Sequence, residues 1–265
     1  MKKYWVIISN EIQRQLVHRF FIISFTGGNF LELLAQLVLW SAIFQSTDIV
    51  KGYTSAEMMS YLVFGWIFRF LTTSYGYENL IYKDIQSGKL SNFIVKPISY
   101  LRYITADSIG RVVIACSVIV LQAVVWIIFL HDKLTVSLSV GTVLLLVAFL
   151  VLSYFIKFFL SVLIGVVGMW TTEVSGVSYL SNVIVKLLSG AYFPMDLLPA
   201  GFVAVSFWFP FVYIFFVPMQ LLIGKIDLWQ GVQGLGVMLL WLVILYLLIK
   251  VVWKVGLKKY ESVGI

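Results

Sequence analysis

Four charged residues stand within stretches of sequence that are otherwise apolar, namely Glu32, Arg69, Lys157 and Lys186. A charge at membrane depth is costly without a partner, so charges in such stretches are typical of ion pairs, subunit interfaces and substrate paths. Glu32 and Arg69 count to mid-depth on consecutive apolar segments, and we predict that they pair. This pair could lock two helices together or take part in substrate binding. Lys157 and Lys186 also count to mid-depth but have no obvious acidic partner, and they could face a subunit interface or an aqueous cavity.

Motifs of soluble enzymes are missing from the sequence. It contains no Gly-x-x-x-x-Gly-Lys-Ser/Thr phosphate loop, no His-Glu-x-x-His zinc motif and no Gly-x-Ser-x-Gly nucleophile motif. The single cysteine, Cys116, has no partner for a disulfide or a metal site. We therefore expect a chain that is not an enzyme and that holds no metal or cofactor of its own.

The elements that must position these charges are membrane helices. Of the 265 residues, 61% are hydrophobic and only 12% are charged, which is about half the charged fraction of a soluble domain. The mean hydropathy is +1.00, so lipid must cover many of the side chains. Six apolar segments approach the roughly 20 residues needed to cross a bilayer, and they cover residues 26–45, 58–78, 108–130, 140–169, 177–193 and 232–252. The sequence thus predicts an all-α integral membrane protein with six transmembrane helices.

The N-terminal residues 4–20 have an apolar face and a polar face. The apolar face includes Trp5, Ile12 and Leu16, and this pattern favours a helix that lies in the membrane interface. The alternative is a cytosolic helix packed against protein. Lys and Arg gather before the first span, between the second and third spans, and after the last span. Because basic residues collect on the cytoplasmic side, this distribution predicts that both termini are cytoplasmic, and the net charge of +7 does not indicate nucleic acid.

The apolar stretch 197–223 differs from the six spans because Pro199, Pro210 and Pro218 interrupt it. A single crossing here would place the basic C-terminal segment on the outer side. We therefore predict a re-entrant hairpin of two short helices that lines an internal surface, because non-helical backbone at membrane depth must be covered by protein or water. A single span kinked by proline is the alternative.

The largest polar connection, residues 79–107, is expected on the cytoplasmic side. Residues 78–87 can form a helix, and Gly88 lies where a C-terminal cap glycine belongs. Lys96-Pro97 then favours extended chain. A transport protein without a nucleotide site must draw its energy from an ion gradient or from another chain. A short helix in this loop could dock onto such a chain, although an ordinary solvated loop would have a similar sequence.

Several motifs resemble the membrane subunits of type-2 ABC exporters. The family's Ser-Gly-x-x-Phe-Pro-x-x-x-x-Pro signature is similar to the segment that contains Ser189, Gly190, Phe193, Pro194 and Pro199. Segments around Pro210 and Pro218 are similar to the family's re-entrant hairpin and its exit. The intracellular loop of the antibiotic-export-like subfamily is similar to Asp84-Ile85-Gln86-Ser87-Gly88-Lys89-Leu90 and Lys96-Pro97-Ile98-Ser99. Residues 170–173 and 256–260 also look like that subfamily, so the resemblance covers nearly the whole chain.

This resemblance implies a role as an exporter permease in the bacterial plasma membrane. Residues 4–20 would be the family's elbow helix, and residues 79–90 would hold a coupling helix that docks into a separate ATPase subunit. The residues expected to carry this coupling are Tyr82, Asp84, Ile85, Gln86, Ser87, Gly88 and Lys89. The working unit would contain two ABC ATPase subunits, which bind ATP and Mg²⁺, and a second permease chain, paralogous or identical. Membrane lipid is the other expected contact, and nucleic acid is not. A scaffold or immunity protein and a gradient-driven secondary transporter remain as alternatives.

Overall fold

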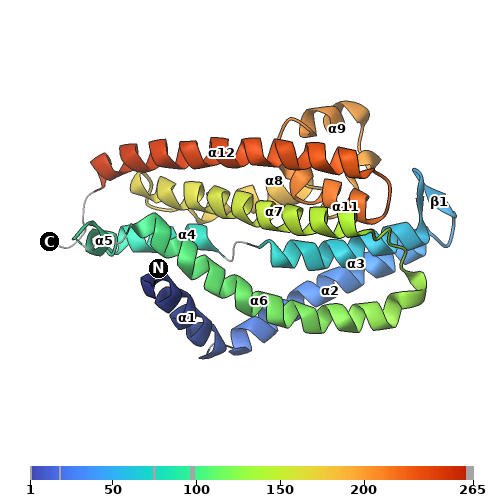
Figure 1. Cartoon of the computed structure of the whole chain (residues 1–265), viewed down its shortest axis with the longest axis horizontal. Helices are drawn as coiled ribbons and strands as arrows, with labels where there is room; N and C mark the ends of the chain where they lie inside the picture. The colour runs from blue at the N-terminus through green and yellow to red at the C-terminus, as the bar shows by residue number, and fades with distance from the viewer. Residues whose placement is uncertain (1, 18, 74–75, 96–98, 261–265) are drawn as a thin grey trace.

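The computed structural model describes residues 2–17, 19–73, 76–95 and 99–260, and most of them are helical (Figure 1). The strands within these ranges are β1 (Ile49–Val50) and β2 (Tyr53–Thr54), which pair antiparallel as one short hairpin. The predicted all-α membrane fold is therefore confirmed at this level of detail.

Helices follow one another along the chain with short connections. Those of the first half are α1 (Lys2–Val17), α2 (Arg19–Ile43), α3 (Ser55–Leu71), α4 (Tyr77–Gln86), α5 (Ser91–Val95) and α6 (Tyr100–Leu130). Those of the second half, with three short 3-10 helices labelled η, are η1 (His131–Lys133), α7 (Val140–Val166), η2 (Val167–Met169), α8 (Ser175–Leu188), η3 (Met195–Leu197), α9 (Ala200–Ser206), α10 (Phe211–Ile214), α11 (Phe216–Leu222) and α12 (Leu228–Lys259).

Three segments in the described part of the chain are long and apolar enough to cross a bilayer: Tyr100–Lys133, Val140–Met169 and Leu228–Lys259. Only 18%, 28% and 17% of their most apolar stretches are buried inside the protein. The rest of these surfaces is therefore available to lipid or to a second chain, as expected of a multi-pass membrane protein. Phe30–Ile43 and Ser175–Leu188 are shorter apolar helices, and the number of six crossings stays a prediction.

The predicted second span, 58–78, is not one helix. Helix α3 ends at Leu71, and the hydroxyl of Thr72 donates a hydrogen bond to the Phe68 carbonyl at 3.0 Å. Helix α4 starts at Tyr77 after Gly76, whose φ of +73° favours glycine. Figure 1 shows α4 lying beyond the end of α3 rather than folding back on it. The predicted span thus contains two helices, and the described residues between them, Thr72, Thr73 and Gly76, are not helical.

The chain beyond α7 also differs from the predicted ranges. Helix α8 ends at Leu188 rather than at residue 193, because Gly190 has φ +78° and turns the chain. In the predicted hairpin 197–223 there are three short α-helices, not two. Pro199 and Pro210 stand at the N-caps of α9 and α10, where a missing amide hydrogen costs little. Every residue of α11 is buried, while α9 projects at the periphery (Figure 1).

The two ends of the elongated molecule are formed by different elements (Figure 1). Helices α4 and α5, the start of α6 and the end of α12 lie together, with α1 beside them, and we call this the α4 end (Figure 1). Strands β1 and β2 lie at the opposite end, the β-hairpin end. This arrangement places the N-terminal helix, the 79–107 segment and the end of α12 on one side. Which side of a membrane that is stays a prediction.

Candidate functional site

Helix α4, at the centre of the predicted coupling segment, is ended by the glycine that the sequence indicated. Gly88 has φ +72°, and its amide donates to the Ile85 carbonyl at 3.1 Å. The amide of Leu90 donates to the Asp84 carbonyl at 3.2 Å. These bonds satisfy carbonyls that the last helical turn leaves free. The helix therefore stops at a fixed position, and the chain turns there into α5.

The inner face of α4 packs against the end of α7. Gly165 and Gly168 allow this close contact, because a β-carbon at either position would lie 2.7 Å from a side-chain atom of Ile81 or Tyr82. Glu78 accepts a hydrogen bond from the Ser178 hydroxyl of α8 at 2.9 Å. Helix α4 is thus fixed against two of the apolar helices.

Two predicted coupling residues hold α4 to the connection between α7 and α8. The Gln86 amide donates to the carbonyls of Gly168 and Thr171 at 3.0 and 3.2 Å. The Tyr82 hydroxyl donates to the Thr172 carbonyl. The structure therefore joins two segments that the sequence analysis singled out separately, the 79–90 loop and residues 170–173.

The other predicted coupling residues separate into buried and exposed groups. Asp84 and Ile85 are only 5% and 3% exposed, so their side chains face the protein interior. Ser87 and Lys89 are exposed, and so is Lys83 on the same helix. A charge introduced at Ile85 would disrupt the core beneath α4 and could not separate coupling from folding. Lys83 and Ser87 are the positions at which a partner contact can be tested.

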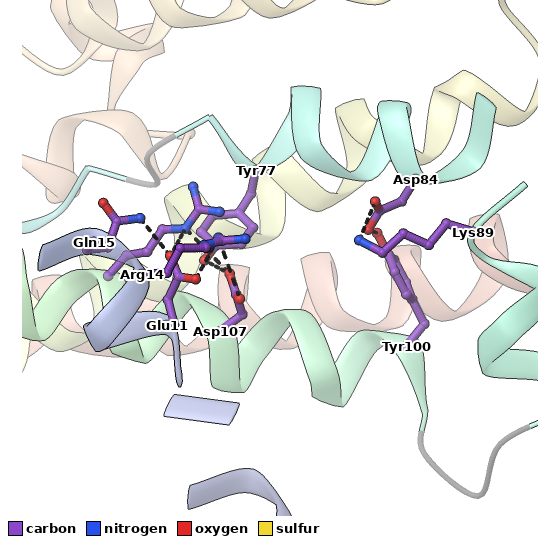
Figure 2. Close-up of polar contacts among 9 residues, drawn as sticks. Glu11, Arg14, Gln15, Tyr77, Asp84, Lys89, Tyr100 and Asp107 are labelled. Atoms are coloured by element: carbon purple, nitrogen blue, oxygen red, sulfur yellow. Dashed lines mark hydrogen bonds and ion pairs between the residues drawn. The ribbon is translucent and has the colours of Figure 1, made fainter. Parts of the chain in front are cut away.

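Asp84 connects α4 to the start of α6 (Figure 2). Its two carboxylate oxygens accept from Lys89 and from the Tyr100 hydroxyl, each at 2.9 Å. The Tyr100 ring in turn stacks on Trp253 of α12 with centroids 5.6 Å apart. A buried carboxylate with a cation and a hydroxyl donor is well compensated. Through Asp84, three helices of the α4 end are held in one arrangement.

A second polar cluster joins α1, α4 and α6 (Figure 2). Glu11 of α1 is only 3% exposed and pairs with Arg14 at 2.6 Å and with Arg111 of α6 at 3.0 Å. Arg111 also lies 3.4 Å from Asp107, which accepts from the Tyr77 hydroxyl at 2.7 Å. Two carboxylates and two guanidinium groups therefore balance one another. We call these five residues the α1–α6 cluster.

The contacts of Tyr77 favour the neutral phenol. Burial and the negative charge of Asp107 raise the pKa of Tyr77 far above its ordinary value, so the hydroxyl keeps its proton and donates. The Arg111 guanidinium lies over the same ring, 4.6 Å from its centroid, a favourable cation–π distance. Tyr77 is the first residue of α4, so the α1–α6 cluster fixes the start of that helix as Asp84 fixes its end.

Helix α1 lies against α6 because Gly110 has no side chain. A β-carbon there would lie 2.9 Å from the Glu11 β-carbon and from the Ile8 carbonyl. Two residues of the predicted apolar face point away from this contact, with Trp5 72% and Leu16 57% exposed, whereas Ile8 and Ile12 of the same face are partly buried. Helix α1 therefore packs on protein through Glu11 and leaves apolar side chains available to lipid. His18 lies outside the described residues, as do residues 96–98 of the predicted Lys96-Pro97-Ile98-Ser99 motif.

The α1–α6 cluster was missed by the sequence analysis, and so was Tyr100. Glu11 is the first acidic residue of the chain, and Asp107 and Arg111 are four residues apart at the entrance of an apolar segment. The sequence signal that could have identified them is the position of each charge at the edge of an apolar segment. Their convergence depends on the packing of α1 against α6, which no local pattern reveals.

The four charges predicted at membrane depth, Glu32, Arg69, Lys157 and Lys186, do not belong to the α1–α6 cluster. Arg69 donates to both carboxylate oxygens of Glu32, at 2.7 and 2.9 Å, so the predicted pairing is confirmed. The Lys157 ammonium donates to the Thr72 hydroxyl at 3.1 Å, and Lys186 lies 5.7 Å from the centroid of the Tyr192 ring. Glu32 is central along α2, but Arg69 lies two residues before the end of α3 rather than in its middle.

The signature residues form turns at the β-hairpin end. Gly190 accepts a hydrogen bond from the buried Tyr61 hydroxyl at 2.7 Å, and Ser189 donates to the Lys186 carbonyl at 3.2 Å. Pro194 precedes η3, where Asp196 accepts from Tyr53 of β2 at 2.7 Å. Three other signature residues are structural: Phe193 packs on the core, Pro199 caps α9, and Pro218 lies in the first turn of α11. The signature therefore connects the segment after α8 to the β-hairpin.

A comparison with protein-family models gives one match. The family described as ABC-2 family transporter protein matches residues 30–264, which is most of the chain. No curated protein and no solved structure matches it.

Proposed function

The chain belongs to the ABC-2 family of transporter proteins, and we propose that it is the permease subunit of an ATP-driven exporter whose ATPase subunits are separate chains. Two permease chains, identical or paralogous, form the translocation path, and two ATPase subunits bind at their α4 ends. The α4 end faces the cytoplasm of a bacterial plasma membrane. ATP and Mg²⁺ are bound and used by the ATPase subunits.

The observation that supports this proposal is the two-sided character of α4. Its inner face is fixed to α7 through Gly165 and to the α7–α8 connection through Gln86. Its outer side presents Lys83 and Ser87. A force applied to the outer side therefore reaches the apolar helices through direct contacts, and packed side chains and hydrogen bonds of this kind can carry coupling between distant sites.

The proposed function predicts which proteins accompany the chain. Purified in mild detergent from its native membrane, it should retain a stoichiometric ATPase that contains a phosphate-binding loop. A second permease-like chain, identified by mass spectrometry, would establish a heterodimer. Isolation without an ATPase would refute the proposal. If the isolated chain then moved a solute, a gradient-driven transporter would be established, and if it did not, a scaffold or immunity role.

The exposed side of α4 gives a second prediction. The double substitution Lys83→Glu and Ser87→Glu should lower ATP-driven transport in proteoliposomes by about tenfold or more, because like charges opposed across an interface cost several kcal/mol. Thermal stability of the purified chain should change little, since both side chains are exposed. The matched control is Lys258→Glu, also exposed and located at the end of α12. Transport equal to that of the control would exclude this face from the ATPase contact.

A further inference from the structure

The four charges predicted at membrane depth include more basic than acidic side chains. The ion pair between Glu32 and Arg69 joins α2 to α3, and the two lysines are not needed for that contact. Arg69 and Glu32 satisfy each other through two hydrogen bonds. Lys157 and Lys186 have no carboxylate within salt-bridge distance among the described residues. Both are nevertheless near enough to the pair to interact electrostatically, Lys186 with Glu32, and Lys157 with Arg69 and Lys186. This group thus holds three basic side chains and one carboxylate, that of Glu32, which is already paired with Arg69.

The position of this group makes the excess costly. Along its helix, Glu32 is about 17 Å, Arg69 about 21 Å and Lys157 about 26 Å from the end nearest the β-hairpin, at 1.5 Å per residue. The hydrocarbon core of a bilayer is roughly 30 Å thick. Glu32, Arg69 and Lys157 therefore all lie less than one such thickness from the β-hairpin ends of their helices, within the apolar part of the protein. A charge at this depth marks a functional site by default.

The backbone that the Lys157 ammonium contacts, at Thr72 just after α3, is not helical. Lys157 donates to Thr72, the residue that ends α3, and α4 resumes only at Tyr77. Backbone outside a helix at membrane depth is tolerated next to protein or a water-filled path. The C-terminal end of α3 attracts cations only weakly, which is too little to offset an ammonium without an acidic partner.

We infer that Arg69, Lys157 and Lys186 bind the anionic group of an amphipathic substrate within the membrane, so that the transported molecule carries a phosphate or a carboxylate. This inference rests on the proposed function and names its substrate class. The two lysines supply donors that no carboxylate among the described residues neutralises. The Lys186 side chain is half-buried and accessible, and the Lys157 ammonium is buried beside Thr72. Glu32 holds Arg69 in a fixed orientation and limits the excess charge. Lipid headgroups and free anions share this chemistry, and the test distinguishes them.

Native mass spectrometry of the full chain, with any subunits that purify with it, tests the inference. Phosphatidylglycerol and phosphatidylcholine with identical acyl chains are offered in equal amounts, with inorganic phosphate as competitor. Phosphatidylglycerol should be retained about tenfold more, because its headgroup carries a net negative charge that can accept charge-assisted hydrogen bonds from the lysines, and phosphatidylcholine carries no net charge. Lys157→Gln and Lys186→Gln should each abolish most of this preference. Displacement by millimolar phosphate would identify a free anion as the ligand, and resistance to it an amphiphile.

Two controls separate a binding site from other roles. Lys254→Gln removes an exposed lysine of α12, and it should leave the preference unchanged. Lys157→Gln should also raise the thermal stability of the chain, because it removes an unpaired charge. Equal retention of both lipids, an equal effect of Lys254→Gln, or lower stability in Lys157→Gln would overturn the inference. The assay contains no ATP, so its result does not depend on whether an ATPase is found.

Discussion

Replacing Glu32 with leucine should destabilise the chain by on the order of 3–5 kcal/mol, the usual cost of removing one partner from a buried ion pair. The side chains of Arg69 and Glu32 are only 11% and 27% exposed. Without Glu32, three cations stand near one another with no carboxylate to balance them. Thermal or denaturant unfolding of the purified protein in detergent measures the change.

Removal of the other partner should cost less, which makes the prediction specific. Arg69→Met leaves Glu32 near Lys186, so its charge still has a cation beside it. The double substitution Glu32→Leu with Arg69→Met should recover a large part of the stability lost in Glu32→Leu, since no unpaired partner remains. Asp132→Leu, at an 85% exposed side chain, is the control and should have little effect. Equal losses in the two single variants would show that Lys186 does not act on Glu32.

Arg111→Met should also destabilise the chain by on the order of 3–5 kcal/mol and should release α1 from α6. Arg111 lies between Glu11 and Asp107, whose side chains are 2% and 5% exposed. Without it, Arg14 alone must balance two carboxylates, and it is itself half exposed and 4.0 Å from Asp107. Unfolding experiments measure the first effect. Hydrogen exchange measures the second, as faster exchange of the α1 amides.

The decisive comparison is between Arg111→Met and a double variant in which Asp107 is also replaced by a neutral residue. Adding Asp107→Asn to Arg111→Met removes the surplus negative charge and should restore a substantial part of the stability and the protection of α1. Arg102→Met is the matched control, because Arg102 is exposed on the same helix. If α1 exchanged at the same rate in Arg111→Met as in the unchanged protein, the α1–α6 cluster would not anchor that helix.

Long uninterrupted apolar segments were predicted well because their signal is local. The predicted segment 140–169 coincides with α7 followed by η2. Gly88 was identified for a similar reason, since a helix end with positive φ requires glycine. The broken segments were predicted less well. The end of α3 at Leu71 depends on two threonine hydroxyls that bond back to the last turn, and threonine in an apolar segment does not by itself end a helix.

The orientation of α4 illustrates what local pattern cannot supply. An amphipathic helix has an apolar face, but the sequence does not say which neighbour covers it. Ile85 was predicted to contact a partner, but its side chain lies on the inner, buried face of α4, in the same core cluster as Ile81 and Tyr100. The glycines that receive α4, Gly165 of α7 and Gly168 of η2, are more than eighty residues further along the chain than the side chains they contact, Ile81 and Tyr82. Nothing in the sequence indicated this connection. The pairing of Glu32 with Arg69 could be predicted because each is a charged residue within an otherwise apolar segment.

Helix α6 runs without interruption for 31 residues, about 46 Å at 1.5 Å per residue. The α1–α6 cluster holds it near Asp107 and Arg111, roughly one third of the way from Tyr100 to Leu130. A rigid rod held at that point acts as a lever with unequal arms. A displacement of 1 Å at Tyr100, the residue bonded to Asp84, would move the far end by roughly 2 Å in the opposite direction. The outer arm ends beside the 131–139 connection, where Thr135 is bonded to Ser60 of α3 at 2.7 Å. Small movements of α4 would thus arrive at the β-hairpin end enlarged and reversed in direction.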